Sequence, residues 1–163
     1  MNNRDTAFFA GGCFWGVEHF MRRINGVISV ESGYMGGALE NPTYYDVKQG
    51  TTGHAETVRV LFNPTIVSYQ TLAKCFFEIH DPCQINGQGA DIGTQYRSEI
   101  FYDNPEQKAI AEALISMLKS KGYAVTTKLT PVTTFYLAED YHQNYTEKHS
   151  IMEPECHHYV KRF

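Results

Sequence analysis

The stretch TAFFAGGCFWGVEHFMRRI, residues 6–24, decides the fold of this chain of 163 residues. Its first five residues form an apolar run, which is typical of a short buried strand. Gly11 and Gly12 end that run, and from Trp15 onward apolar residues recur at helical spacing. The pattern predicts a strand that passes directly into a helix, with Cys13 at the junction.

The rest of the chain continues this alternation of strands and helices. Apolar patterns predict strands at residues 27–33, 56–62, 98–102 and 133–138. Helical stripes cover residues 72–79 and residues 105–118, and Gly122 follows the second stripe as a stop signal. Glycine-rich segments without periodicity lie at residues 34–53 and 80–97, and long irregular segments of this kind are usually functional. This order predicts an α/β (α+β) sandwich of a mixed sheet and covering helices.

Length and composition describe one globular catalytic domain over residues 1–163. Hydrophobic residues make up 42% of the chain and charged residues 20%, as in ordinary globular proteins. The net charge of −4 argues against nucleic acid as a main partner, since phosphate binding requires a basic surface. No apolar run is long enough to span a membrane, and the N-terminal residues do not resemble a secretory signal. We therefore expect a cytoplasmic protein without a membrane partner.

The C-terminal segment has a different composition. From about residue 146 the chain is polar and rich in histidine, which predicts a loosely packed, mobile tail. Cys156 lies in this tail between Glu155 and His157, where the sequence suggests no packing role for it.

The four cysteines are too few and too scattered for a disulfide scaffold; they are Cys13, Cys75, Cys83 and Cys156. Cys75 falls on an apolar helical stripe, so we expect it to be inert. Cys13 precedes a helix, where the helix dipole and unpaired backbone N–H groups favour a reactive thiolate. The neighbouring glycines leave room for a substrate, and Phe14 and Trp15 offer an apolar wall. The alternative is a buried structural cysteine in a tight turn.

Polar residues among glycines mark further candidate positions. Glu56 ends the loop GTTGHAE (residues 50–56) and is either a carboxylate held at a cleft or a solvated loop acid. Asp91 and Tyr96 lie in QGADIGTQYRS (residues 88–98), which is typical of a binding loop. Tyr34 in GYMGG (residues 33–37) belongs to the same class, and its alternative is a packed surface tyrosine.

The histidines are better explained as structural residues than as metal ligands. His54, His80 and His142 are expected to stabilise loops. A metal site could be assembled from His80 and Cys83 together with residues 156–158, but it lacks paired Cys-x-x-Cys or helical histidine spacing. We therefore expect neither a metal nor another cofactor.

Five blocks of sequence, in order, resemble the A-type peptide methionine sulfoxide reductases. They are GGCFWGVE (11–18), GYMGG (33–37), YYDVKQGTTGHAE (44–56), HDPCQINGQGADIGTQYRS (80–98) and YHQNY (141–145). The resemblance implies a two-layer α/β fold without a metal. It also implies reduction of the S epimer of methionine sulfoxide, free or in oxidised proteins, with thioredoxin or another dithiol as reductant. We expect the enzyme to be a monomer.

The resemblance assigns roles residue by residue. It matches Cys13 to the nucleophile and Glu56 to the catalytic acid. It matches Phe14 and Trp15 to the pocket for the substrate methyl group. It matches Tyr34, Asp91 and Tyr96 to the polar groups around the sulfoxide oxygen. These residue types suit the chemistry, because a sulfoxide oxygen leaves only when protonated or strongly hydrogen-bonded while a thiolate attacks the sulfur.

Recycling requires a second thiol, which condenses with the resulting sulfenic acid to form a disulfide. We expect Cys156 to be that thiol, because a polar tail can carry it to the site. Cys83, which stands where the family commonly has threonine, is a possible competitor. A second departure from the family pattern is Ala90, which replaces the usual asparagine before Asp91.

Two other functions compete with this interpretation. A Cys-His hydrolase would pair Cys13 with His54 or His142, but the sequence offers no oxyanion hole and no group to orient the base. A redox-sensing module would use a reversible disulfide to change shape without catalytic turnover.

Overall fold

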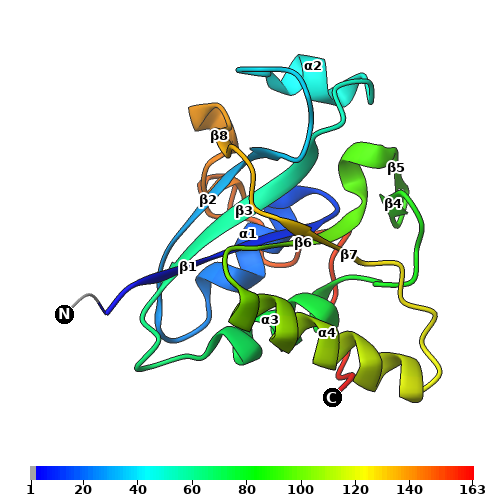
Figure 1. Cartoon of the computed structure of the whole chain (residues 1–163). Coiled ribbons are helices and arrows are strands. Elements are labelled where there is room, and N and C mark those ends of the chain that lie inside the picture. Colours follow the sequence, from blue (N-terminus) through cyan, green and yellow to red (C-terminus); the bar gives the residue numbers. More distant parts are fainter. Residues whose placement is uncertain (1–2) are drawn as a thin grey trace.

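The computed structural model describes residues 3–163 and is built around a mixed six-stranded sheet (Figure 1). The strand order is β7-β6-β1-β3-β2-β8, and only β6 and β7 pair in parallel. The strands are β1 (Asp5–Gly11), β2 (Val27–Met35), β3 (Ala55–Phe62), β6 (Ser98–Tyr102), β7 (Lys128–Pro131) and β8 (Tyr136–Leu137). A separate hairpin joins β4 (Gly87–Gln88) to β5 (Asp91–Ile92).

Three helices form the second layer: α1 (Phe14–Arg22), α3 (Tyr69–Ile79) and α4 (Pro105–Ser120). They contact one another in sequence order and pack against β1, β2, β3, β6 and β7. Two short helices complete the chain: α2 (Tyr44–Lys48) lies apart from this layer (Figure 1), and α5 (Tyr145–Lys148) contacts α1. The expected two-layer sandwich of a mixed sheet and covering helices is therefore confirmed.

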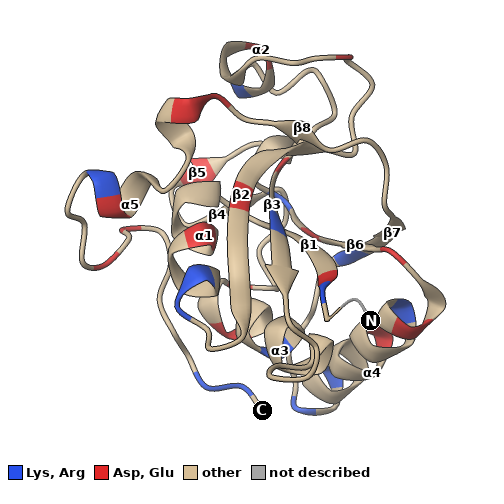
Figure 2. Ribbon diagram, turned by 90° about the vertical axis from the view of Figure 1, so that its left-hand side faces the viewer, with Lys and Arg blue, Asp and Glu red and all other residues tan. Residues whose placement is uncertain are grey.

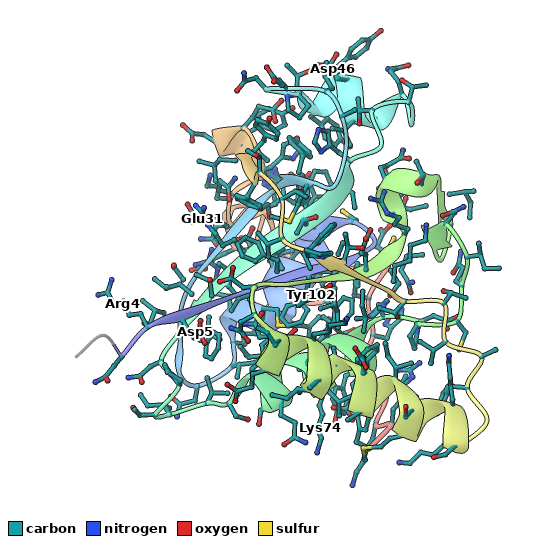
Figure 3. The ribbon with its side chains drawn as sticks, in the orientation of Figure 1. Arg4, Asp5, Glu31, Asp46, Lys74 and Tyr102 are labelled. Carbon is teal, nitrogen blue, oxygen red and sulfur yellow. The ribbon has the colours of Figure 1, made fainter. Side chains whose placement is uncertain are left out.

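The apolar run at the start of the chain forms β1 because both faces of that strand are buried. Ala7 and Phe9 belong to the main core between the sheet and the helices. Phe8 and Ala10 point to the opposite face, where Phe135 and the segment before β8 cover them. The side chains of Figure 3 fill both spaces, whereas the labelled Arg4, Glu31 and Lys74 lie at the surface. This burial on both faces fixes the end of β1, and hence Cys13, beneath the helices.

Most predicted elements are confirmed, with three differences. The helix after Cys13 ends at Arg22, before the apolar Ile24. The predicted strand at residues 133–138 is wrong for most of its length, because only Tyr136–Leu137 pairs with β2. Phe135 turns aside there to cover Phe8. The strand β7 was not predicted, since its four residues carry no alternating pattern.

After α5 the chain has no regular element as far as Phe163, and its conformation is set by individual contacts. The Val160 N–H donates to the Glu78 carbonyl oxygen at 2.7 Å, and the Phe163 ring packs beside the main core. His157 is 1% exposed. The irregular course of this segment agrees with the predicted tail. The Val160 hydrogen bond, the Phe163 ring and the buried His157 hold the segment against α1 and α3. Its mobility stays a prediction.

Charged residues of both signs are spread over the elements in Figure 2. For example, the exposed side of α4 carries Glu106, Lys108 and Lys119. Among residues 3–163, no helix combines the length and the apolar content needed to cross a membrane.

Candidate active site

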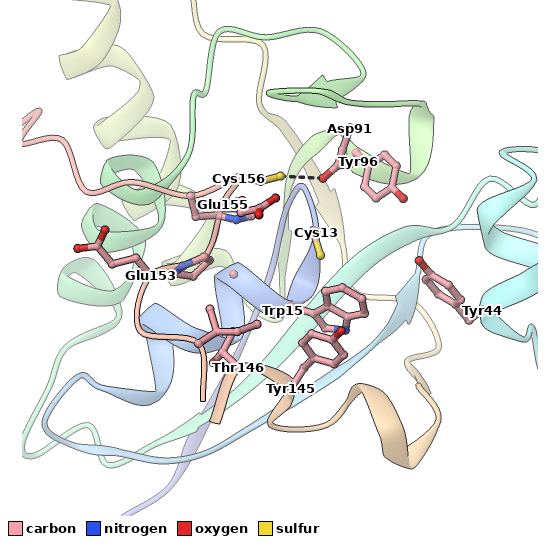
Figure 4. Close-up of a pocket in the computed structure, with 14 residues that line it drawn as sticks. Cys13, Trp15, Tyr44, Asp91, Tyr96, Tyr145, Thr146, Glu153, Glu155 and Cys156 are labelled. Carbon is pink, nitrogen blue, oxygen red and sulfur yellow. Dashed lines mark hydrogen bonds between the residues drawn. The ribbon is translucent and has the colours of Figure 1, made fainter. Parts of the chain in front are cut away.

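Cys13 lies between β1 and α1, at the wall of a cavity of about 450 Å³ (Figure 4). Gly12 takes the tight turn there with a φ of +94°, which a residue with a side chain rarely adopts. The main walls of the cavity are Cys13, Trp15, Tyr44, Asp91, Tyr96 and Tyr145. The C-terminal residues 153–157 close one side of the cavity, so four separate parts of the chain meet around one thiol.

Glu56 comes from the neighbouring strand β3 and is 2% exposed. Its Oε1 accepts a hydrogen bond from the Phe14 N–H at 3.1 Å, immediately after Cys13. Burial raises the pKa of Glu56 to about 8, the Phe14 hydrogen bond opposes this shift, and Asp91 adds to it. Glu56 is therefore protonated at neutral pH and can donate a proton.

Opposing effects act on the pKa of the Cys13 thiol. Burial raises this pKa far above its ordinary value, and Glu56, which is ionised at the high pH where the thiol would lose its proton, raises it further. The hydrogen bond from the Trp15 backbone N–H lowers the pKa, as expected of a helix start, but it is the smaller effect. The helix start therefore favours the thiolate as expected, but in this substrate-free conformation burial outweighs it.

Trp15 forms an apolar wall of the cavity in an orientation fixed by two contacts. Its ring stacks on Tyr145 with 3.6 Å between centroids and 3° between planes. Its indole N–H donates to His142 Nδ1 at 2.9 Å. Phe14 does not line the cavity: it is 1% exposed and packs behind it against Tyr34 and His142. Of the two rings expected to face the substrate, Trp15 lines the cavity and Phe14 does not.

Tyr34 also differs from its predicted place around a sulfoxide oxygen. It pairs with Glu56 across β2 and β3, but it is fully buried and does not line the cavity. Its hydroxyl donates to Glu139 Oε1 at 2.8 Å, and Glu139 Oε2 accepts the Tyr44 N–H at 2.8 Å. Tyr34 and Glu139 therefore position Tyr44, which does line the cavity.

Asp91 and Tyr96 do face the cavity, from β5 and from the short helical turn after it (Figure 4). The Cys156 thiol donates to Asp91 Oδ2 at 3.1 Å. Burial raises the pKa of Cys156 to about 11, and this hydrogen bond contributes to the shift. The expectation that Cys156 has no packing role is wrong, because its thiol contacts Asp91. Asp91 is directed into the cavity although Ala90 precedes it.

The other two cysteines lie elsewhere. Cys83 is absent from the cavity walls, and its backbone N–H donates to Asp81 Oδ1 at 2.9 Å. Cys75 packs beside the core on α3, as predicted. Of the two possible resolving thiols, only Cys156 therefore shares a cavity with Cys13.

The predicted structural roles of the histidines agree with their contacts. His54 Nδ1 accepts the Gly37 N–H, and its Nε2 donates to the Leu39 carbonyl oxygen. His80 bonds the Phe76 carbonyl oxygen and the Ser98 hydroxyl. His142 Nδ1 accepts a hydrogen bond from the Trp15 indole N–H, so the neutral His142 ring carries its own proton on Nε2. Neither ring nitrogen is then free to act as a base. Residues 3–163 contain no cluster of three His, Cys, Asp or Glu side chains that could hold a metal.

Sequence reasoning missed several residues of this site, namely Tyr44, Glu139, Tyr145 and His157. The motifs that contain Tyr44 and Tyr145 were noticed, but their rings were not assigned to the cavity. The one sequence signal that could have placed Tyr44 and Tyr145 in the cavity is that each is an aromatic residue at one end of a recognised motif. Glu139 and His157 act through contacts with residues 105 and 146 positions away in the sequence, which motif spacing does not reveal.

Comparisons with known proteins agree on one family. The family model described as "Peptide methionine sulfoxide reductase" matches residues 5–162. The protein named "Peptide methionine sulfoxide reductase MsrA" of Saccharolobus solfataricus is 50% identical over 153 residues, covering 93% of this chain and 86% of its own. The protein of the same name from Sulfolobus acidocaldarius is 44% identical, covering 98% and 95% of the two chains.

Solved structures give the same result. Reduced Mxr1 from Saccharomyces cerevisiae superposes with a TM-score of 0.88 and 33% identity, covering 96% of this chain and 92% of that one. Mxr1 has also been solved in complex with Trx2; that structure, at 22% identity, shares the fold with a TM-score of 0.63, covering 96% and 90% of the two chains.

Proposed function

Because the chain belongs to the peptide methionine sulfoxide reductase family, we propose that it reduces methionine sulfoxide to methionine through Cys13. The substrate is the S epimer, free or in oxidised proteins, as the sequence resemblance implies. The observation that carries the proposal is the buried Glu56, whose pKa of about 8 leaves it protonated beside the Cys13 thiol.

The first step transfers oxygen from substrate to enzyme. Glu56 donates its proton to the sulfoxide oxygen, which makes the substrate sulfur electrophilic. The Cys13 sulfur attacks as its own proton passes to Glu56, and the oxygen moves to Cys13. The products are a Cys13 sulfenic acid and methionine, and the number of protons in the site is unchanged.

The cavity walls support this substrate. Trp15 and Tyr145 form an apolar wall for the S-methyl group, and Asp91, Tyr96 and Tyr44 supply polar atoms elsewhere on the cavity wall. Selectivity for one epimer follows from such an arrangement, because exchanging the methyl group and the oxygen would place each against the wrong wall.

The second step regenerates the enzyme. The Cys156 sulfur attacks the sulfenic sulfur of Cys13, the S–O bond breaks, and water leaves. An external dithiol then reduces the Cys13–Cys156 disulfide, and we assign this task to thioredoxin. The complex of the related Mxr1 with Trx2 supports that partner class.

The same chemistry supports a cytoplasmic location, since Cys13 must begin each cycle as a free thiol in a reducing compartment. We also propose that the enzyme is a monomer. Sedimentation analysis of the reduced protein tests the monomer.

The function is tested with separated R and S methionine sulfoxide and with dithiothreitol or thioredoxin as reductant. We expect turnover of the S epimer with both reductants. Reversible disulfide formation without methionine release on either epimer would instead identify a redox-sensing module.

A further inference from the structure

The residue after Cys156 is one of the most deeply buried polar residues of the C-terminal segment. His157 is 1% exposed, although residues 158–161 beside it are exposed. Its Nε2 donates to the Gly11 carbonyl oxygen at 2.7 Å. Because a carbonyl only accepts, the neutral ring carries its proton on Nε2 and places Nδ1, unpaired within the described structure, toward α1.

The ring occupies a slot that exists because residue 16 is glycine. A Cβ added to Gly16 would lie 2.0 Å from His157 Nδ1 and 2.7 Å from its Cγ. Gly16 has helical backbone angles within α1, so close approach of the imidazole, rather than an unusual φ, explains the glycine. The end of β1 and the first turn of α1 thus form a binding site for the His157 side chain of the tail.

This docking site lies next to both reacting thiols. Gly11 and Gly16 flank Cys13 in sequence, and His157 directly follows Cys156. Both cysteines and His157 line the same cavity (Figure 4). The Asp91 carboxylate accepts the Cys156 thiol from the opposite side, so the tail is held at two adjacent residues.

The backbone hydrogen bonds that flank this site lie farther along the chain, and the Tyr159 hydroxyl adds a contact to Glu78 Oε2 at 3.5 Å. The Ile151 N–H bonds the Thr146 carbonyl oxygen, and the Val160 N–H bonds the Glu78 carbonyl oxygen. The eight residues between these two points could follow many paths, and each added freedom lowers the effective concentration of Cys156 at Cys13. A docked His157 removes much of that freedom.

We propose that His157 is a positioning residue that docks the tail on Gly11 and Gly16 and so sets the rate of Cys13–Cys156 disulfide formation. This inference rests on the proposed function, because it concerns the second step of that reaction. In that step the Cys156 thiol loses its proton, its sulfur bonds to Cys13, and the sulfenic oxygen leaves as water. His157 exchanges no proton and forms no bond during oxygen transfer, so the release of the first methionine depends on it less than disulfide formation does.

The test compares His157→Ala with the matched control His158→Ala, whose side chain is exposed. Reduced protein is mixed with methionine S-sulfoxide without reductant, and samples are quenched with a thiol-alkylating reagent. Mass spectrometry then measures methionine, the Cys13–Cys156 disulfide, and the sulfenic acid trapped by dimedone. His157→Gln is the conservative variant, because its terminal amide can still donate toward the Gly11 carbonyl oxygen.

In His157→Ala we expect disulfide formation slower by at least about tenfold, which is the order of a lost buried hydrogen bond and ring contact. Because His157 also lines the cavity, any slowing of the methionine burst should be clearly smaller than that of the disulfide step, so that the sulfenic acid accumulates. His158→Ala should match the wild type, and His157→Gln should recover part of the rate. Disulfide formation at the wild-type rate in His157→Ala would overturn the proposal. Equal slowing of the burst and the disulfide would also overturn it, by indicating a general structural role. Absence of any burst in the wild type would instead refute the proposed function.

Discussion

Replacing Glu56 with glutamine tests both its catalytic role and its unusual protonation. Glutamine keeps the size of the side chain and an oxygen that can accept the Phe14 N–H, but it cannot transfer a proton. Removal of a general acid costs roughly 10²- to 10⁴-fold in the chemical step. The first measurement is the single-turnover rate of methionine release near neutral pH, with Glu112→Gln on the exposed side of α4 as the control.

The same substitution has a second, independent consequence for stability. Burial raises the native pKa of Glu56 from 4.5 to about 8, so between these values the native carboxyl is protonated while the unfolded one is ionised. Unfolding then releases a proton, and the free energy of unfolding falls by about 1.4 kcal/mol for each unit of rising pH. Glu56→Gln removes this contribution. Its stability relative to the wild type should therefore increase by about 4 kcal/mol from pH 5 to pH 8.

Urea unfolding of both proteins at several pH values in that window measures the difference directly. Because the argument concerns a slope, a constant change in packing caused by glutamine does not affect it. A stability difference that stays constant with pH would show that Glu56 ionises normally. An unchanged single-turnover rate would show that Asp91 or another group is the acid.

Four further predictions concern the other site residues and pH. Cys13→Ser should remove sulfoxide reduction, since an alkoxide is scarce near neutral pH; residual turnover above a few per cent of wild type, roughly, would identify another nucleophile. Trp15→Ala should lower kcat/KM for methyl sulfoxides by about 1–3 kcal/mol of transition-state binding, and an unchanged preference for methyl over ethyl sulfoxides would exclude Trp15 from the pocket. Cys156→Ser should release about one methionine per enzyme but lose thioredoxin-driven turnover; peptide mapping of the oxidised wild type that finds a Cys13–Cys83 link would contradict the assignment. The wild-type single-turnover rate should fall above about pH 8 as Glu56 loses its proton, and a rate that rises steadily through pH 9 would contradict this order of events.

The sequence predicts the β1–α1 junction because the information is local there. An apolar run, two glycines and a helical stripe follow one another within twenty residues, and the position of Cys13 follows from them. The same holds for β6 and α4, whose boundaries agree with their patterns. By contrast, residues 133–138 have the pattern of a strand, but Phe135 packs over Phe8 and does not pair with a neighbouring strand.

The walls of the cavity are less predictable, because they come from irregular segments. Tyr44 is oriented by a carboxylate about a hundred residues away, and Tyr145 by its stacking on Trp15. Neither contact produces a periodic pattern in the sequence. Burial depth is equally invisible in the sequence, which is why the sequence indicates the effect of the helix start on the pKa of Cys13 but not the larger effect of burial.

A raised pKa on both Cys13 and Glu56 is compatible with fast chemistry, since oxygen transfer consumes no net proton. In a cavity where burial penalises charge, a resting thiolate beside a carboxylate would be costly. A neutral thiol and a neutral acid avoid that cost until a sulfoxide arrives. In the proposed mechanism, the carboxylate becomes a base for the adjacent thiol once the sulfoxide oxygen has taken the proton of Glu56. The nucleophile is then generated only when its substrate is in place, which also protects Cys13 from oxidants that cannot accept that proton.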